Sequence, residues 1–142
     1  MISKIYYSIW SDCIKKIQTV PSSKKRWRFY TLTVMSLLMA LNFMFVMMVI
    51  QNSTLGVHYF YKLNIDIFPD TKLDAFLSFF ILFMLPMLVI NYILIIRNDR
   101  YKKIIDMYPT QNGKLFLKYL LASLWIPFLL LIISLLYFNI TK

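Results

Sequence analysis

The chain has 142 residues, of which 60% are hydrophobic and only 15% are charged, and its formal net charge is +10. No segment outside the apolar runs is long enough to bury an independent core, because even a domain of about 60 residues is only marginally stable. The single cysteine excludes an intrachain disulfide and a cysteine-based zinc cluster. These properties indicate a small membrane protein rather than a soluble domain.

The first 28 residues form a basic arm that we predict to be an amphipathic helix on the cytoplasmic side. Apolar side chains recur at spacings of three and four over residues 2–20, which places them on one face of a helix. Ser11 and Asp12 fall on the opposite, polar face, and Trp10 flanks the apolar stripe, where it suits a headgroup region.

Such a helix, attached to a membrane span, is typical of the inner lipid interface, where anionic headgroups attract its basic face. We therefore expect a bilayer with anionic headgroups to be a partner of the arm. The predicted lipid-interface residues are cationic or aromatic: Lys15, Lys16, Lys24, Lys25, Arg26, Trp27 and Arg28.

Three apolar runs, residues 29–51, 75–96 and 115–138, follow the arm. None contains an acidic residue, and Lys118 is the only basic one. At about 1.5 Å per residue each run is roughly 33–36 Å long as a helix, enough to cross a hydrocarbon core of about 30 Å. We predict an all-α integral membrane protein with three transmembrane helices, an external loop at 52–74, a cytoplasmic basic connection at 97–114 and an external tail at 139–142.

The cations are unequally distributed about these spans. Thirteen of the sixteen lie before the first run or between Arg97 and Lys118, and three lie on the other side. The positive-inside rule therefore predicts a multi-pass protein of the inner (plasma) membrane with a cytoplasmic N-terminus and an external C-terminus. Because topology accounts for the excess positive charge, we expect no nucleic-acid partner.

The cytoplasmic connection is predicted to begin as a helical continuation of the second span. Asp99 and Lys103 are four residues apart and can pair across one helical turn. Pro109 then stops this helix before the third span begins.

The spans contain neutral polar residues and prolines, namely Asn42, Pro86, Asn91, Ser123 and Pro127. Pro86 cannot donate a backbone hydrogen bond and leaves the carbonyl of Leu82, four residues earlier, without its helical partner. Because Asn42 and Leu82 lie at similar depth in neighbouring spans, we predict that the Asn42 amide bonds to this carbonyl. The alternative is that Asn42 lines a pore or a ligand crevice.

No catalytic set is present in the sequence, and we expect neither an enzyme nor a cofactor. The only histidine, His58, precedes Asp66 and Asp70 in the external loop, but their spacing matches no recurrent metal-ligand pattern. The spans carry no charge at depth, which argues against ion-coupled transport.

We therefore expect a small non-catalytic protein that acts through helix–helix contacts in the bilayer. It would be an accessory subunit, or a protective, immunity-type binder of a membrane-active partner, and it could also associate with itself. The alternative is an oligomeric pore or membrane-disrupting effector, in which copies place Asn42, Asn91 and Ser123 around a lumen.

Overall fold

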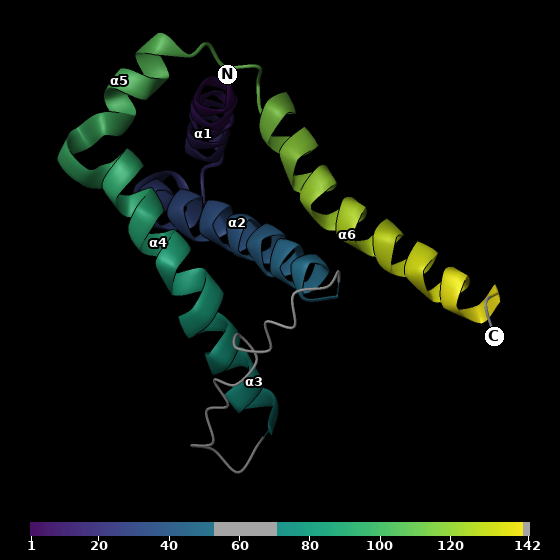
Figure 1. Cartoon of the computed structure of the whole chain (residues 1–142). Coiled ribbons are helices and arrows are strands. Elements are labelled where there is room, and N and C mark those ends of the chain that lie inside the picture. Colours follow the sequence, from purple (N-terminus) through teal and green to yellow (C-terminus); the bar gives the residue numbers. More distant parts are fainter. Residues whose placement is uncertain (53–70, 141–142) are drawn as a thin grey trace.

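The computed structural model describes residues 1–52 and 71–140, and every regular element in these two ranges is helical (Figure 1). The α-helices are α1 (Ile2–Thr19), α2 (Trp27–Asn52), α3 (Thr71–Phe79), α4 (Leu85–Asn91), α5 (Arg100–Met107) and α6 (Lys114–Ile140). Short 3-10 turns occupy Lys24–Arg26 and Arg97–Asp99, and π-helical segments occupy Phe80–Met84 and Tyr92–Ile96. The all-α prediction is thus confirmed for the described residues, whereas His58, Asp66 and Asp70 lie outside them.

Two helical stretches, Lys24–Met47 and Lys72–Met107, are long and apolar enough to cross a membrane. The first contains most of α2, and the second runs from α3 through α4 to α5. α6 is also apolar, over 27 residues, with Pro127 inside it.

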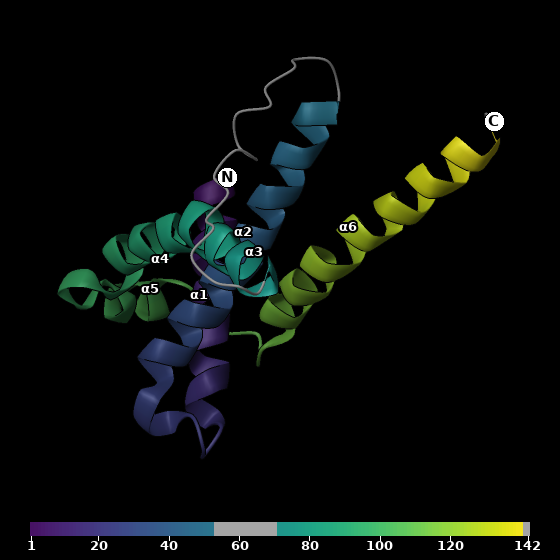
Figure 2. The same cartoon turned by 90° about the horizontal axis from the view of Figure 1, so that it is seen from below.

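The helix α1 lies within the bundle and contacts α2, α5 and α6. The chain reverses after Val20, so that α1 runs antiparallel to the first half of α2 (Figure 2). The core at this end of the molecule consists of Trp10, Cys13, Ile14, Met35, Ile95, Tyr101 and Ile104. It therefore joins α1 and α2 to the π-helical segment Tyr92–Ile96 and to α5, which follow much later in the sequence.

This packing overturns the polar face predicted for α1. Trp10, Ser11 and Asp12 are all 0% exposed, although Trp10 was expected among headgroups and the other two in water. The physical reason is that α1 has neighbours on more than one side. Periodicity identifies the residues that share a helix face, but it does not reveal how many faces other helices cover.

The long helices diverge with distance from α1. In Figures 1 and 2 the second half of α6 stands away from both α2 and α4. The large apolar side chains exposed on this half are Phe128, Leu129, Leu130, Ile133 and Leu136. Exposed apolar surfaces of this kind typically mark contacts with lipid or with another protein.

The predicted helical continuation from the second span into the connection is wrong. Asn98 and Asp99 both have left-handed backbone conformations, with φ of 58° and 53°, so the chain turns sharply before α5. Asn and Asp tolerate this conformation better than most residues do. The helix that follows ends at Met107, shortly before Pro109, as predicted.

Candidate functional site

The carboxylate of Asp12 holds the beginning of α6 against α1. It accepts five hydrogen bonds, from the Thr110 hydroxyl (2.9 Å) and from the backbone amides of Gln111 (2.7 Å), Gly113 (3.0 Å), Leu115 (2.9 Å) and Phe116 (3.2 Å). The first amides of a helix have no partner within that helix, and they form the positive end of its dipole. Asp12 therefore caps α6 from a helix about 100 residues earlier in the chain.

The ionisation of Asp12 follows from these contacts. Burial raises the pKa of its carboxyl, but the amides of Gly113 and Phe116, the Thr110 hydroxyl and the Gln111 amide together outweigh burial. The net pKa lies below the ordinary value of 3.8. Asp12 is therefore a carboxylate at neutral pH, which suits the positive helix end that it contacts.

The loop before α6 can approach α1 because Gly113 has no side chain. Its φ is +83°, in the left-handed region that favours glycine, and a Cβ atom here would lie 2.9 Å from the Cγ and Cδ atoms of Lys16. Next to this contact, the Ser11 hydroxyl donates to the Tyr108 carbonyl at 2.8 Å. An Asn-Gly pair such as Asn112-Gly113 is typical of a turn, but nothing in the sequence indicated that Asp12 would be the acceptor.

Asn91, one of the predicted intramembrane residues, joins three helices. It is 0% exposed, its Oδ1 accepts a hydrogen bond from the Tyr6 hydroxyl of α1 at 2.7 Å, and its Nδ2 donates to Ser36 Oγ of α2 at 2.9 Å. Burial raises the pKa of Tyr6 to about 12, so that its hydroxyl stays protonated and remains a donor.

Asn42 joins α2 to α6 instead of bonding to Leu82. Its Nδ2 donates to Ser123 Oγ at 2.9 Å and to the Tyr119 hydroxyl at 3.2 Å. The predicted contact with the Leu82 carbonyl is therefore wrong. Equal depth in two spans makes a contact possible, but the Asn42 amide bonds to hydroxyl acceptors on α6 instead.

Pro86 is accommodated by a local change of helix type. It follows the π-helical segment Phe80–Met84, where the Leu85 amide bonds to the Phe80 carbonyl, five residues earlier. A widened turn of this kind removes the demand for the ordinary bond that a proline cannot make. The helical stretch thus continues through Pro86 with a π-helical segment before it.

A shallow groove of about 250 Å³ separates α2 from α6. Its lining includes Asn42, Ser123 and Pro127, which brings together three of the five predicted intramembrane candidates. Asn91 belongs instead to the contact between α1, α2 and α4, and Pro86 lies elsewhere on that second stretch.

Two of the predicted lipid-interface residues pack against α5. The Arg28 guanidinium donates to the Tyr101 hydroxyl at 2.8 Å and to Asp99 Oδ1 at 3.3 Å, and it lies over the Tyr101 and Trp27 rings. Lys102 also pairs with Asp99, at 3.1 Å. The predicted partner of Asp99, Lys103, is wrong, because Asp99 precedes α5 in a left-handed conformation rather than forming part of a continuous helix.

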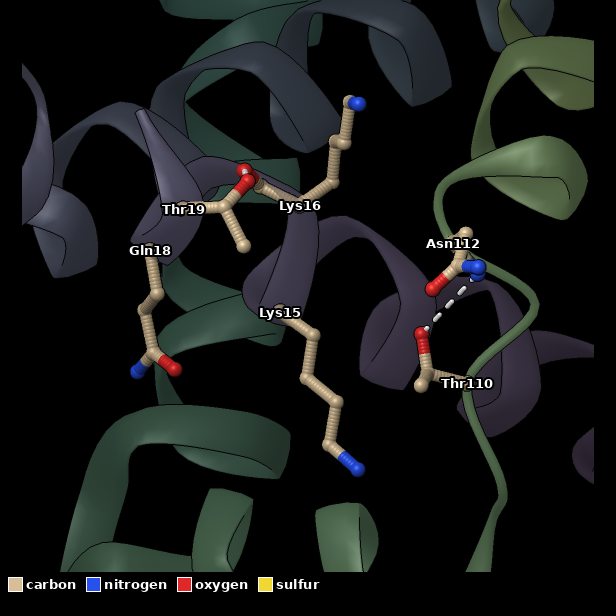
Figure 3. Close-up of a pocket in the computed structure, with 6 residues that line it drawn as sticks. All are labelled: Lys15, Lys16, Gln18, Thr19, Thr110 and Asn112. Atoms are coloured by element: carbon tan, nitrogen blue, oxygen red, sulfur yellow. Dashed lines mark hydrogen bonds between the residues drawn. The ribbon is translucent and has the colours of Figure 1, made fainter. Parts of the chain in front are cut away.

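The remaining predicted lipid-interface residues are cations. Lys15 and Lys16 line a groove of about 430 Å³ together with Gln18, Thr19, Thr110 and Asn112. In Figure 3 the two ammonium groups lie toward opposite ends of this groove rather than converging on one point. Lys24, Lys25 and Arg26 are exposed. Their contact with lipid stays a prediction.

Within residues 1–52 and 71–140, no group of three or more His, Cys, Asp or Glu side chains could hold a metal ion. Comparison of the chain with protein-family models, with curated proteins and with solved structures finds no match. The candidate site is thus defined by its own contacts: the Asp12 cap and the two asparagine clusters.

Proposed function

We propose that this chain is a non-catalytic protein of the inner (plasma) membrane that crosses the bilayer three times and acts through helix–helix contacts. The spans would be α2, the α3–α4 stretch and α6, with the N-terminus cytoplasmic and the C-terminus external. Support comes from the apolar length of these three elements and from the cations at one end of each.

The hydrogen bonds of Asn42 and Asn91 are the observation that favours a binding role over a pore. Asn91 is fully buried with both ends of its amide bonded, and the Asn42 amide nitrogen is bonded to α6 of the same chain. Groups that lined a lumen would instead face water. The arrangement therefore favours asparagines that hold one chain together over asparagines that line a channel between copies.

The exposed second half of α6 supplies the surface for a partner. Its apolar side chains lie on a helix that α2 and α4 leave uncovered, as the two views in Figures 1 and 2 agree. We propose that the chain is an accessory subunit, or an immunity-type binder of a membrane-active partner. The exposed half of α6 would be the surface that contacts this partner in the bilayer.

The test is capture of partners from native membranes in mild detergent, followed by mass spectrometry. The double variant Phe128→Ala/Leu129→Ala on α6 should lose a membrane-protein partner that the wild-type chain retains. Ile81→Ala/Leu85→Ala, which shortens exposed side chains on the second stretch, is the matched control. Loss in both variants, or capture of no membrane protein by the wild type, would refute the proposed surface.

Expression in cells distinguishes the binding role from the alternative, an oligomeric pore. A reporter fused after Lys142 should be active only outside the cytoplasm, and expression should leave the membrane potential unchanged. Depolarisation that disappears on substitution of Asn42 by leucine would instead establish the pore. A reporter active in the cytoplasm would overturn the three-span topology.

A further inference from the structure

We propose that a groove between α1, α5 and the π-helical segment Tyr92–Ile96 binds an anionic phospholipid, with its phosphate at Arg100 and Lys103. The groove has a volume of about 380 Å³, and its lining combines these two cations with Leu94, Ile104, Met107 and two tyrosines. The inference rests on the proposed membrane insertion, but not on the proposed protein partner.

Arg100 and Lys103 are available to a ligand. They are three residues apart on α5 and so share a face, and both are exposed. Neither forms an ion pair with any described residue, whereas their neighbour Lys102 is engaged by Asp99. Among the described residues that line the groove none is acidic. A guanidinium fork beside an ammonium group matches the oxygens of a phosphodiester.

The rest of the groove matches the other end of a lipid. Leu94, Ile104 and Met107 form its apolar part, and the rings of Tyr7 and Tyr108 lie 5.9 Å apart at its side. Tyrosines of this kind favour the boundary between headgroups and acyl chains. A free phosphate would leave these apolar side chains without a partner, whereas a phospholipid would cover them.

An exposed apolar surface continues from the groove along the second stretch. Ile93 and Ile90, which precede Leu94 by one and four residues, are 40% and 45% exposed. An acyl chain attached to a phosphate at Arg100 can therefore follow this surface into the proposed bilayer. The groove thus has positive charge at one end and apolar surface at the other, and this combination favours a lipid over a soluble anion as the ligand.

The groove at Lys15 and Lys16 lacks this combination. Its two ammonium groups diverge (Figure 3), and the aliphatic part of Lys16 packs close to Gly113. Among the described residues, its lining consists of the two lysines and four neutral polar residues, with no large apolar side chain. The Arg100–Lys103 groove is thus the better site for a lipid with both headgroup and chains.

The test uses the purified full chain in a nonionic detergent, with lipid retention measured by native mass spectrometry. Phosphatidylglycerol and phosphatidylcholine with the same acyl chains are titrated separately. The wild type should retain phosphatidylglycerol about tenfold more strongly, since each well-placed cation adds to the attraction for an anionic headgroup. Arg100→Gln/Lys103→Gln should lower its apparent affinity for phosphatidylglycerol to the level of phosphatidylcholine.

The matched control is Lys114→Gln/Lys118→Gln, which removes the same charge from exposed positions at the beginning of α6, outside the groove. It should change lipid affinity by less than about twofold. Equal losses in the two double variants would show diffuse charge attraction and overturn the site, as would equal retention of both lipids. Displacement of phosphatidylglycerol by millimolar inorganic phosphate would identify a soluble anion as the ligand and overturn the lipid assignment.

Helicity by circular dichroism and the C-terminal reporter check that the variants fold and insert. A variant that loses lipid selectivity while keeping its topology and its captured partner supports the lipid site independently of the proposed function. Loss of the partner with lipid selectivity intact would leave the lipid site standing and refute only the protein-binding role.

Discussion

Asp12 takes the place of water or a local capping residue at the beginning of α6. Its Oδ2 accepts from the Leu115 and Phe116 amides of the first helical turn, which have no partner within α6, and its Oδ1 accepts from the Gln111 and Gly113 amides just before the helix. Hydrogen bonds to a charged group are stronger than those between neutral groups, and a buried amide left without an acceptor is costly. This one residue therefore couples the packing of α1 to the position of α6.

Asp12→Asn should lower the free energy of unfolding by about 2–4 kcal/mol, because the amide NH₂ would face backbone donors instead of accepting from them. The measurement is unfolding in mixed micelles followed by circular dichroism. Asp106→Asn, at an exposed position on α5, is the control and should change stability by less than about 0.5 kcal/mol. Equal effects of the two substitutions would contradict the cap.

The pKa of Asp12 also predicts a dependence of stability on pH. Since its pKa in the folded chain is below the ordinary 3.8, its contribution is fully present above that value and is lost as the pH falls through the lower folded pKa. Thermal unfolding at pH 6 and at pH 3 should therefore differ more for the wild type than for Asp12→Asn. An identical acid shift in both proteins would assign the acid sensitivity to other carboxyl groups.

The contact between Tyr6 and Asn91 can be measured by a double-mutant cycle. Tyr6→Phe and Asn91→Leu should each destabilise the chain, with a coupling energy of about 0.6–1.5 kcal/mol, as expected for one polar contact between helices in a membrane. Tyr6→Phe with Ser123→Ala is the control cycle, since Ser123 bonds to Asn42 rather than to Tyr6. Additive effects of Tyr6→Phe and Asn91→Leu would refute the hydrogen bond.

The turn at Asn98 and Asp99 determines how α5 folds back against α1 and α2. Two successive non-glycine residues with positive φ are uncommon, and each costs free energy that the surrounding packing must offset. Arg28 and Lys102 hold Asp99 from two sides, and Tyr101 and Ile104 enter the core directly after the turn. The core contacts of α5 and the ion pairs thus stabilise the same turn.

Substitution of Asn98 tests this conformation with a pair of opposite outcomes. Asn98→Gly should stabilise the chain by up to about 1 kcal/mol, because glycine adopts positive φ without strain, whereas Asn98→Ala should destabilise it by about 1 kcal/mol. Both variants remove the same exposed side chain, so each is the control for the other. Chemical unfolding in mixed micelles measures the difference, and a preference for alanine would indicate that the helix continues through this position.

The enclosure of α1 is a property of the whole molecule, and Ser11 provides a way to test it. In a Cys13→Ser background, Ser11→Cys should react with a maleimide at least about tenfold more slowly than Ser3→Cys, because Ser11 is 0% exposed and Ser3 lies at the open end of α1. Circular dichroism checks that both variants fold. Equal reaction rates would mean that α1 presents Ser11 to water, as a helix lying flat on the lipid would.

In the whole molecule, α1 packs between the longer helices at one of their ends. Its contacts with α2, α5 and α6 gather these elements at one end, while their other ends diverge (Figures 1 and 2). Polar contacts at the gathered end, through Asp12 and Asn91, fix the relative positions of the helices. The apolar surfaces at the diverging end remain available to lipid or to a partner helix.

The sequence by itself determined the helices, because their apolar lengths and their helix-breaking residues are local properties. The predicted runs 29–51 and 115–138 lie within α2 and α6, and Pro109 lies just beyond the end of α5 as expected. Asn42 and Asn91 were also identified as residues of interest, because polar groups within apolar runs need partners.

Only the tertiary structure decided which partners those residues have. Asn42 bonds to Tyr119 and Ser123 rather than to Leu82, and Asp12 lies in the core rather than in water. Helical periodicity and depth are one-dimensional quantities, and they do not specify which helices are adjacent or on how many sides. The Asp12 carboxylate of α1 therefore accepts hydrogen bonds from groups about 100 residues away in the chain. This pairing depends on three-dimensional packing alone.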